Sequence, residues 1–188
     1  RSILASLVDT IGAGAVEAVG VTGQAPTLLL IDGAGRPLRP AILWLDVRSE
    51  EAVEGGAARV GSEAEGASGN RLHGYYLGPK LAWLRQHEPS RFLEGVSVLQ
   101  SHSYPVLRLT GARVTDYSSA ALCAPLYDAR ARTWSPEVCS KLDVDPRWLP
   151  AHASQVRPAA AGPVGAERRS RVRSQRGLRA RAPAAAET

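Results

Sequence analysis

Methionine is absent from the 188 residues, cysteine occurs only twice, and no apolar run is long enough to cross a membrane. A membrane-spanning helix needs about 18 or more apolar residues in succession, so we expect no membrane segment. Asp9 interrupts the first apolar stretch, which argues against a secretory signal. Because no methionine starts the chain, we expect that the N-terminal part of the protein is missing from this sequence.

The two cysteines, Cys123 and Cys139, belong to no CxxC pair and stand beside apolar residues. Buried free thiols have this setting, and a reducing cytoplasm is the simplest compartment for them. A single disulfide between the two is the alternative that the sequence leaves open. So few cysteines exclude a disulfide-dense miniprotein.

The net charge of +5 belongs to one end of the chain. Residues 1–150 hold 15 basic and 16 acidic side chains, which gives −1, whereas residues 151–188 hold 8 and 2, which gives +6. The near-neutral first part gives no electrostatic reason to expect nucleic acid. An arginine-rich arm that binds nucleic acid or an acidic surface is the alternative, and its affinity would depend strongly on salt.

The composition also changes near residue 150. Residues 151–188 contain 11 alanines and 8 arginines but one leucine and no aromatic residue. Such a segment cannot bury enough apolar surface to offset its ordering entropy. We therefore expect a folded domain over residues 1–150 and a tail over residues 151–188, with disorder from about residue 155.

Apolar patterns in the first part alternate between strands and helices, which predicts an α/β fold. Strands are expected at residues 16–21, 27–31 and 41–45, and residues 96–99 are expected to form a short strand or a buried connector. Helices are expected from residue 4 to Gly12, over residues 48–60 with Asp46 as the cap, over residues 77–84, and after Ser135. Residues 61–74 are rich in glycine, serine, glutamate and asparagine, which predicts a loop.

The common catalytic and phosphate-binding motifs are missing. The Gly12–Gly14 pair precedes a strand, whereas a dinucleotide fold needs the glycines after one, and no GxxxxGK[ST] loop exists. Ser101-His102-Ser103 has no orienting acid nearby in sequence, as a nucleophilic site would need. The four histidines show no metal-ligand spacing.

A sharper pattern is Trp44-Leu45-Asp46-Val47-Arg48. If this stretch is extended, Trp44, Asp46 and Arg48 lie on one side of it. An aromatic plate beside a carboxylate and a guanidinium suits a sugar, which offers a C–H face and hydroxyls. The alternative is a core tryptophan with Asp46 as a helix cap paired to Arg48.

Three further polar residues stand where a ligand could reach them. Gln24 follows Gly23 at the end of a predicted strand, where ligand residues often lie in α/β sheets, and a glutamine that stabilises the turn is the alternative. Tyr75 precedes a helix and faces either a cleft or the core. Asp116 opens a helix start that is rich in capping residues, and a cap is the alternative to a ligand role.

In this order the segments resemble the FGGY family of carbohydrate kinases, nearest to its xylulokinase-like and glycerol kinase-like members. The matching motifs are Val21–Gln24, the Asp32-Gly-x-Gly turn, Pro37–Arg48, Gly78–Leu84, Leu109–Gly111, Thr115–Ala120 and Trp134–Ser135. The resemblance covers about residues 3–150. It implies an incomplete actin-like (ribonuclease H-like) N-terminal domain, with sugar and ATP bound between two such domains in the intact protein.

The resemblance also implies the chemistry, which is phosphoryl transfer from MgATP to a sugar or polyol hydroxyl with an aspartate as base. It places Trp44 and Tyr75 near the substrate. It also places there the two residues after Gln24, which in this chain are Ala25 and Pro26 and have no hydrogen-bonding side chains. The expected substrate-binding set is Gln24, Ala25, Pro26, Trp44, Asp46, Arg48, Tyr75 and Asp116.

Parts of the family pattern have no match in this sequence. These are the opening hairpin with its Asp-x-Gly-Thr motif, the catalytic aspartate and the adenosine-binding domain. We therefore expect no catalytic residue in this chain, no tight binding of MgATP and no sugar phosphorylation by the chain alone. A non-catalytic sugar-binding or regulatory module is the alternative. Without the hairpin the sheet would have an unpaired edge, which favours aggregation.

Overall fold

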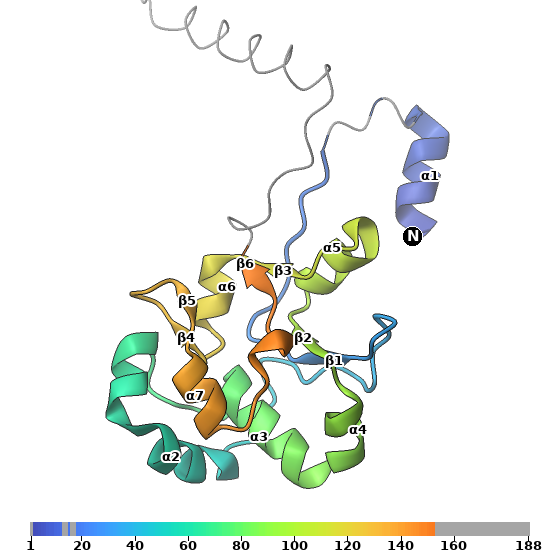
Figure 1. Ribbon diagram of the computed structural model, residues 1–188. Helices are drawn as coiled ribbons and strands as arrows, with labels where there is room; N and C mark the ends of the chain where they lie inside the picture. Colours follow the sequence, from blue (N-terminus) through green and yellow to red (C-terminus); the bar gives the residue numbers. More distant parts are fainter. Residues whose placement is uncertain (1, 13–14, 16–17, 153–188) are drawn as a thin grey trace, which may run out of the picture. The chain divides into compact units, whose positions relative to one another are not determined.

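The structure is a computed structural model that describes residues 2–12, 15 and 18–152, all within one unit that spans Arg1–Gln155. It is an α/β fold, as expected (Figure 1). The helices are α1 (Ser2–Ile11), α2 (Glu51–Ser68), α3 (Leu77–His87), α4 (Pro89–Glu94), α5 (Ser103–Thr110), α6 (Tyr117–Ala121), α7 (Pro136–Lys141) and the 3-10 helix η2 (Pro146–Trp148). The strands are β1 (Leu29–Ile31), β2 (Ser97–Leu99), β3 (Val114–Thr115), β4 (Tyr127–Asp128), β5 (Thr133–Trp134) and β6 (Ala151–His152).

The strands form short pairs. β1 and β2 run antiparallel with Leu29 opposite Leu99 and Ile31 opposite Ser97, and every residue of both strands is buried. This pair confirms the strands predicted at residues 27–31 and 96–99, because a short apolar run bounded by turns suits a strand covered on both faces. β3 pairs with β6 in parallel, and β4 pairs with β5 in antiparallel.

The main core lies between β1, β2 and the helices α2, α3 and α7 (Figure 1). The leucine stripe of α3 is buried as predicted: Leu77, Leu81 and Leu84 are each 2% exposed or less. Burial of one leucine side chain contributes about 2 kcal/mol, so this stripe anchors α3 firmly. This anchoring matters because α3 also carries Lys80, whose contacts organise the candidate site.

Two of the predicted strands are wrong in the described residues. Over residues 41–45 only Ile42 pairs, with Leu28, and the chain then turns at Trp44. The ladder stops because the Leu43 carbonyl accepts from the Asp46 amide instead of from a neighbouring strand. Residues 18–21 form no strand, since no described segment pairs with them, and residues 16 and 17 lie outside the described residues.

Helix α2 differs from the prediction at both ends. It begins three residues later than expected, at Glu51, and Asp46 does not cap it. It ends at Ser68, so the first half of the loop predicted over residues 61–74 is helical. Gly69 ends it with a φ of +71°, a left-handed conformation that glycine adopts at little cost.

The other local predictions are confirmed. α1 ends before Gly12, which has a φ of +82°. The Ser135 hydroxyl accepts from the Val138 amide at 3.2 Å and caps α7. Both cysteines are buried and free.

The predicted tail lies almost wholly outside the described residues, so its boundary and its disorder stay predictions. None of the helices in the described part of the chain is long and apolar enough to span a membrane.

Candidate functional site

Lys80 on α3 connects two segments that carry most of the predicted site residues. Its side chain is fully buried, and its Nζ donates to the Pro26 carbonyl at 3.0 Å and to the Leu43 carbonyl at 2.8 Å. Burial lowers the pKa of Lys80 to about 8, and the charge of Asp46 opposes that effect. One amine therefore ties the Gln24 segment (residues 23–26) to the Trp44 turn (residues 43–46).

The Gln24 segment is held from a second direction by Ser101. The Ser101 hydroxyl donates to the Gln24 carbonyl at 2.6 Å. The backbones approach so closely that a Cβ on Gly23 would lie 2.5 Å from Ser101 Oγ and 2.9 Å from the His102 nitrogen. The Gln24 side chain is exposed, Ala25 is half-buried, and Pro26 is buried with its carbonyl turned to Lys80.

The face expected along residues 44–48 does not form as an extended strand. Trp44 is 43% exposed, so it is not a core tryptophan. The Asp46 carboxylate binds Arg48 through Nε at 2.9 Å and Nη2 at 2.7 Å, and this contact lowers the pKa of Asp46. The Arg48 guanidinium lies 5.0 Å from the centre of the Trp83 ring, so it stacks on α3. The pairing of Asp46 with Arg48 is confirmed, whereas the cap and the common face are wrong.

Tyr75 lies just before α3 and lines a different hollow. Its ring packs against His73 and Tyr76 with centroids 4.4 and 4.3 Å away, and its hydroxyl donates to that of Tyr76 at 3.1 Å. This hollow of about 760 Å³ also has Glu50, Glu65 and Arg71 in its walls, and Trp44 does not line it. The expected neighbourhood of Trp44 and Tyr75 is therefore not supported by a shared cavity.

Asp116 is the cap of α6, as its alternative interpretation predicted. Its carboxylate accepts from the Ser119 amide at 2.9 Å and the Ser119 hydroxyl at 2.7 Å. Burial works against ionisation, but these hydrogen bonds and the nearby His102 hold the pKa of Asp116 below its usual value. His102 Nε2 lies 3.4 Å from the carboxylate, so the Ser101-His102 turn links Asp116 to the Gln24 segment.

Sequence reasoning missed Lys80, Ser101 and His102 as organisers of this region. One signal could have found Lys80: the chain has 2 lysines against 21 arginines, and one of them lies inside the Gly78–Leu84 motif. The structure thus brings the Gln24 segment, the Trp44 turn and Asp116 into one connected region. It places Tyr75 just before α3, in the wall of a different hollow.

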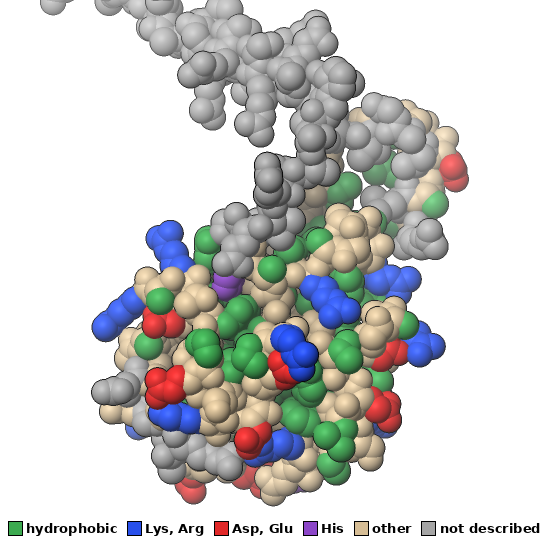
Figure 2. Space-filling view, in the orientation of Figure 1, with side chains coloured by type: hydrophobic (Ala, Val, Ile, Leu, Met, Phe, Trp, Pro, Cys, Tyr) green, Lys and Arg blue, Asp and Glu red, His purple; other side chains and the backbone are tan. Residues whose placement is uncertain are grey.

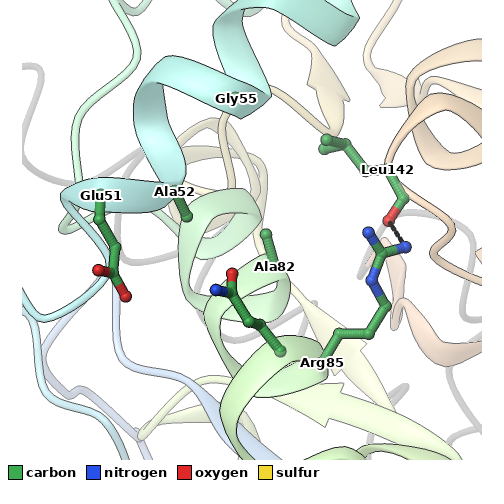
Figure 3. A pocket seen from close by; sticks show the side chains of 7 residues that line it. Glu51, Ala52, Gly55, Ala82, Arg85 and Leu142 are labelled. Atoms are coloured by element: carbon green, nitrogen blue, oxygen red, sulfur yellow. Dashed lines mark hydrogen bonds between the residues drawn. The ribbon is translucent and has the colours of Figure 1, made fainter.

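A second, smaller hollow lies between α2, α3 and the residue that follows α7 (Figure 3). Its volume is about 230 Å³, and Arg85 closes one side by donating to the Leu142 carbonyl at 3.3 Å. None of the predicted site residues lines it. On the molecular face in Figure 2, basic and acidic side chains are interspersed without a large patch of one sign.

The sequence profile of the N-terminal domain of the FGGY family of carbohydrate kinases matches residues 1–185. Glycerol kinase of Nocardia farcinica is 33% identical over 156 residues, which cover 79% of this chain and 31% of that protein. Xylulose kinase of Escherichia coli K12 is 36% identical over 136 residues, 72% of this chain and 28% of that protein.

The crystal structure of xylulose kinase from Rhodospirillum rubrum superposes with a TM-score of 0.72 at 32% identity, covering 81% of this chain and 32% of that one. The chain thus spans less than a third of the length of each of these relatives. The family match and the shared fold agree with the order of motifs along the chain. The chain belongs to the FGGY family of carbohydrate kinases and has the fold of part of the actin-like N-terminal domain.

Proposed function

We propose that this chain supplies one wall of the sugar-binding cleft of a carbohydrate kinase. The observation that carries the proposal is the joint fixing of the Gln24 segment and the Trp44 turn by Lys80. Both segments present an exposed side chain, an amide from Gln24 and an indole from Trp44. An aromatic face suits the C–H face of a sugar, and an amide both donates to and accepts from hydroxyls.

The names of two relatives support the substrate class. These relatives are named for xylulose and glycerol, which are small polyhydroxylated molecules. In the intact protein the reaction is phosphoryl transfer from ATP to one hydroxyl of such a molecule, in which positioning and charge neutralisation supply most of the catalysis. Gln24, Ala25 and Trp44 are the residues of this chain that we assign to the sugar side, whereas Asp116 serves as the cap of α6. Pro26, Asp46 and Arg48 hold these segments in place: the Pro26 carbonyl accepts from Lys80, and Asp46 pairs with Arg48, which rests on Trp83.

The Asp32 turn does not fit a phosphate group of MgATP. In the Asp32 turn the Asp32 carboxylate already accepts from the Ala34 amide at 2.9 Å, from the Arg36 amide at 2.8 Å and from the Arg36 side chain. These amides are therefore not available to cradle a phosphate. We assign the binding of MgATP to other parts of the intact protein.

The first experiment tests binding. The chain is titrated by calorimetry with D-xylulose, glycerol and a panel of pentoses, hexoses and polyols. Trp44→Ala should weaken binding of the preferred sugar at least ten-fold, and Trp44→Phe should restore part of it because a ring remains. Leu93→Ala is the matched control, since Leu93 is 80% exposed on α4. The absence of binding by the unmodified chain, or equal binding by Trp44→Ala, would contradict the proposal.

A second experiment tests turnover. With MgATP and the bound sugar, the chain alone should release no sugar-dependent ADP in a coupled assay. Sugar binding without turnover is the result that both a kinase part and a non-catalytic sugar-binding module predict. Mixing the chain with the rest of a xylulose kinase separates the two, because only a kinase part would restore turnover. The cytoplasmic location stays a prediction that fractionation of the source cells would test.

A further inference from the structure

We propose that Lys80 is a positioning residue that makes the two sugar-facing segments a single ordered wall. Lys80 is fully buried on a helix, and its ammonium group lies between two backbone carbonyls that are 17 residues apart in sequence, Pro26 and Leu43. Its role in sugar binding rests on the proposed function, whereas its effect on the order of the two segments does not.

The chemistry of the contact explains why a lysine is required. An ammonium group carries three donors and no acceptor, so one side chain can serve two carbonyls at once. Hydrogen bonds from a charged donor are about twice as strong as neutral ones. A neutral apolar side chain of the same length would leave both the Pro26 and Leu43 carbonyls without this partner, and burial makes such a loss costly.

The electrostatic surroundings fit the same role. Asp46 is the charged group whose field favours the ammonium form of Lys80, and it lies in the Trp44 turn itself. Asp46 is in turn held by Arg48, whose guanidinium rests on Trp83 of α3. The Trp44 turn is therefore fastened to α3 twice, through Lys80 and through Arg48.

The buried stem of Lys80 is anchored by its helix. Leu77, Leu81 and Leu84 surround it in sequence and lie in the main core. The Lys80 amide donates to the Tyr76 carbonyl at 3.3 Å. The ammonium group therefore has a fixed position from which it orients both segments. The exposed Trp44 and Gln24 side chains are positioned by the backbone of those segments.

The test compares Lys80→Met with Lys141→Met by amide hydrogen exchange. Lys141 is the other lysine of the chain and pairs with Glu137 on α7 at 2.6 Å. Lys80→Met should speed exchange at least five-fold in peptides that cover residues 23–28 and 42–46. In these peptides the Leu28, Ile42 and Asp46 amides donate to backbone carbonyls, so their exchange rates measure the order of the two segments. Peptides that cover β4 and β5 should change less than two-fold, and Lys141→Met should change none of these segments.

A variant that weakens the whole domain separates positioning from general stability. Val138→Ala opens the core on α7 and should speed exchange everywhere, including β4 and β5. Lys80→Arg keeps a charged donor and should restore part of the protection. Where Lys80→Met does not fold, Lys80→Gln retains a short donor and takes its place. Uniform loosening by the Lys80 variants, or loosening of one segment alone, overturns the proposal.

Sugar titration completes the test. Lys80→Met should lower the affinity for the preferred sugar at least ten-fold, and Lys141→Met should leave it within two-fold. Unchanged affinity in a variant whose two segments have loosened overturns the positioning role. If the unmodified chain binds no sugar but the two segments still loosen together, the proposed function falls while Lys80 remains the residue that orders the wall.

Discussion

The Ser101 hydroxyl donates to the Gln24 carbonyl at 2.6 Å across 77 residues of sequence. This bond joins the segment before β1 to the turn after β2, at the end where those two strands stop pairing. Together with the Lys80 contact it fixes two carbonyls of this segment, those of Gln24 and Pro26. The Gln24 side chain is left as the group of that segment that can meet a ligand.

Ser101→Ala should reduce the free energy of unfolding by about 1 kcal/mol, the usual net value of one hydrogen bond. The effect is modest because the Gln24 segment is partly exposed and water can replace the hydroxyl. Urea unfolding monitored by circular dichroism measures it. Ser118→Ala serves as the control, since Ser118 is exposed on α6 and should change stability by less than about 0.5 kcal/mol.

Gly78→Ala and Gly55→Ala should shift stability in opposite directions. A Cβ on Gly78 would lie 2.5 Å from Pro125 Cδ and 2.9 Å from the Ala124 carbonyl, so α3 would have to move at a cost of about 1–3 kcal/mol. A Cβ on Gly55 meets nothing within 4 Å, and alanine in a helix is up to about 1 kcal/mol better than glycine. Melting temperatures of both variants test this prediction, and equal shifts in melting temperature would contradict the close approach at Gly78.

Lys80 should make stability rise with pH in the alkaline range. Its pKa falls from 10.5 in the unfolded chain to about 8 in the folded protein, so the folded state binds fewer protons between these values. The unfolding free energy of the unmodified chain should therefore rise relative to Lys80→Met between pH 8 and 10.5, by at most about 3 kcal/mol. Groups with raised pKa values, such as Cys139, are present in both proteins and cancel in the difference.

The comparison requires urea unfolding at several pH values from 7.5 to 10.5. A flat difference between the two proteins would show that Lys80 keeps its ordinary pKa in the folded state. A falling difference would mean that the folded protein holds the Lys80 proton more tightly than the unfolded chain does.

His152 should make the domain sensitive to mild acid. It is 1% exposed on β6, its ring contacts Tyr117, Tyr127 and Trp134, and burial lowers its pKa from 6.5. The unfolded chain takes up the proton more readily, so stability is lost as the pH falls through 6.5. His152→Phe keeps an aromatic ring in place and should flatten this dependence. Melting temperatures at pH 5.0 and 7.5 test it, and an unchanged pH slope would contradict it.

The parts of the fold that sequence predicted are those that local chemistry decides. The run Thr27–Ile31 is too short and too apolar for anything but a buried strand, and the leucine stripe of α3 has helical spacing. Ser135 and Asp116 cap helices because their oxygens reach amides three residues on. Each of these features depends on neighbours within a few residues.

The features that sequence did not predict depend on distant contacts. The Trp44 turn is held by the hydrogen bond from Lys80 to the Leu43 carbonyl, which joins residues 37 positions apart. No local sequence pattern predicts that bond. The segment over residues 18–21 needs a neighbouring strand to become one, and no described segment pairs with it. Helix α2 is the exception, because its end is set locally by the left-handed Gly69 and not by a distant partner. The geometry of the candidate site therefore depends on long-range partners, whereas the core residues can be predicted from local apolar patterns.

The burial of Lys80 also determines how the protein can be tagged. Amine-reactive reagents attack a neutral amine that solvent can reach, and of the two lysines only Lys141 is exposed. Of the lysine side chains, a dye or a surface linker would therefore attach to Lys141 on α7 and not to Lys80. Among the lysine side chains the fold thus leaves one handle for fluorescence or immobilisation, which is used beside the α-amino group of the chain.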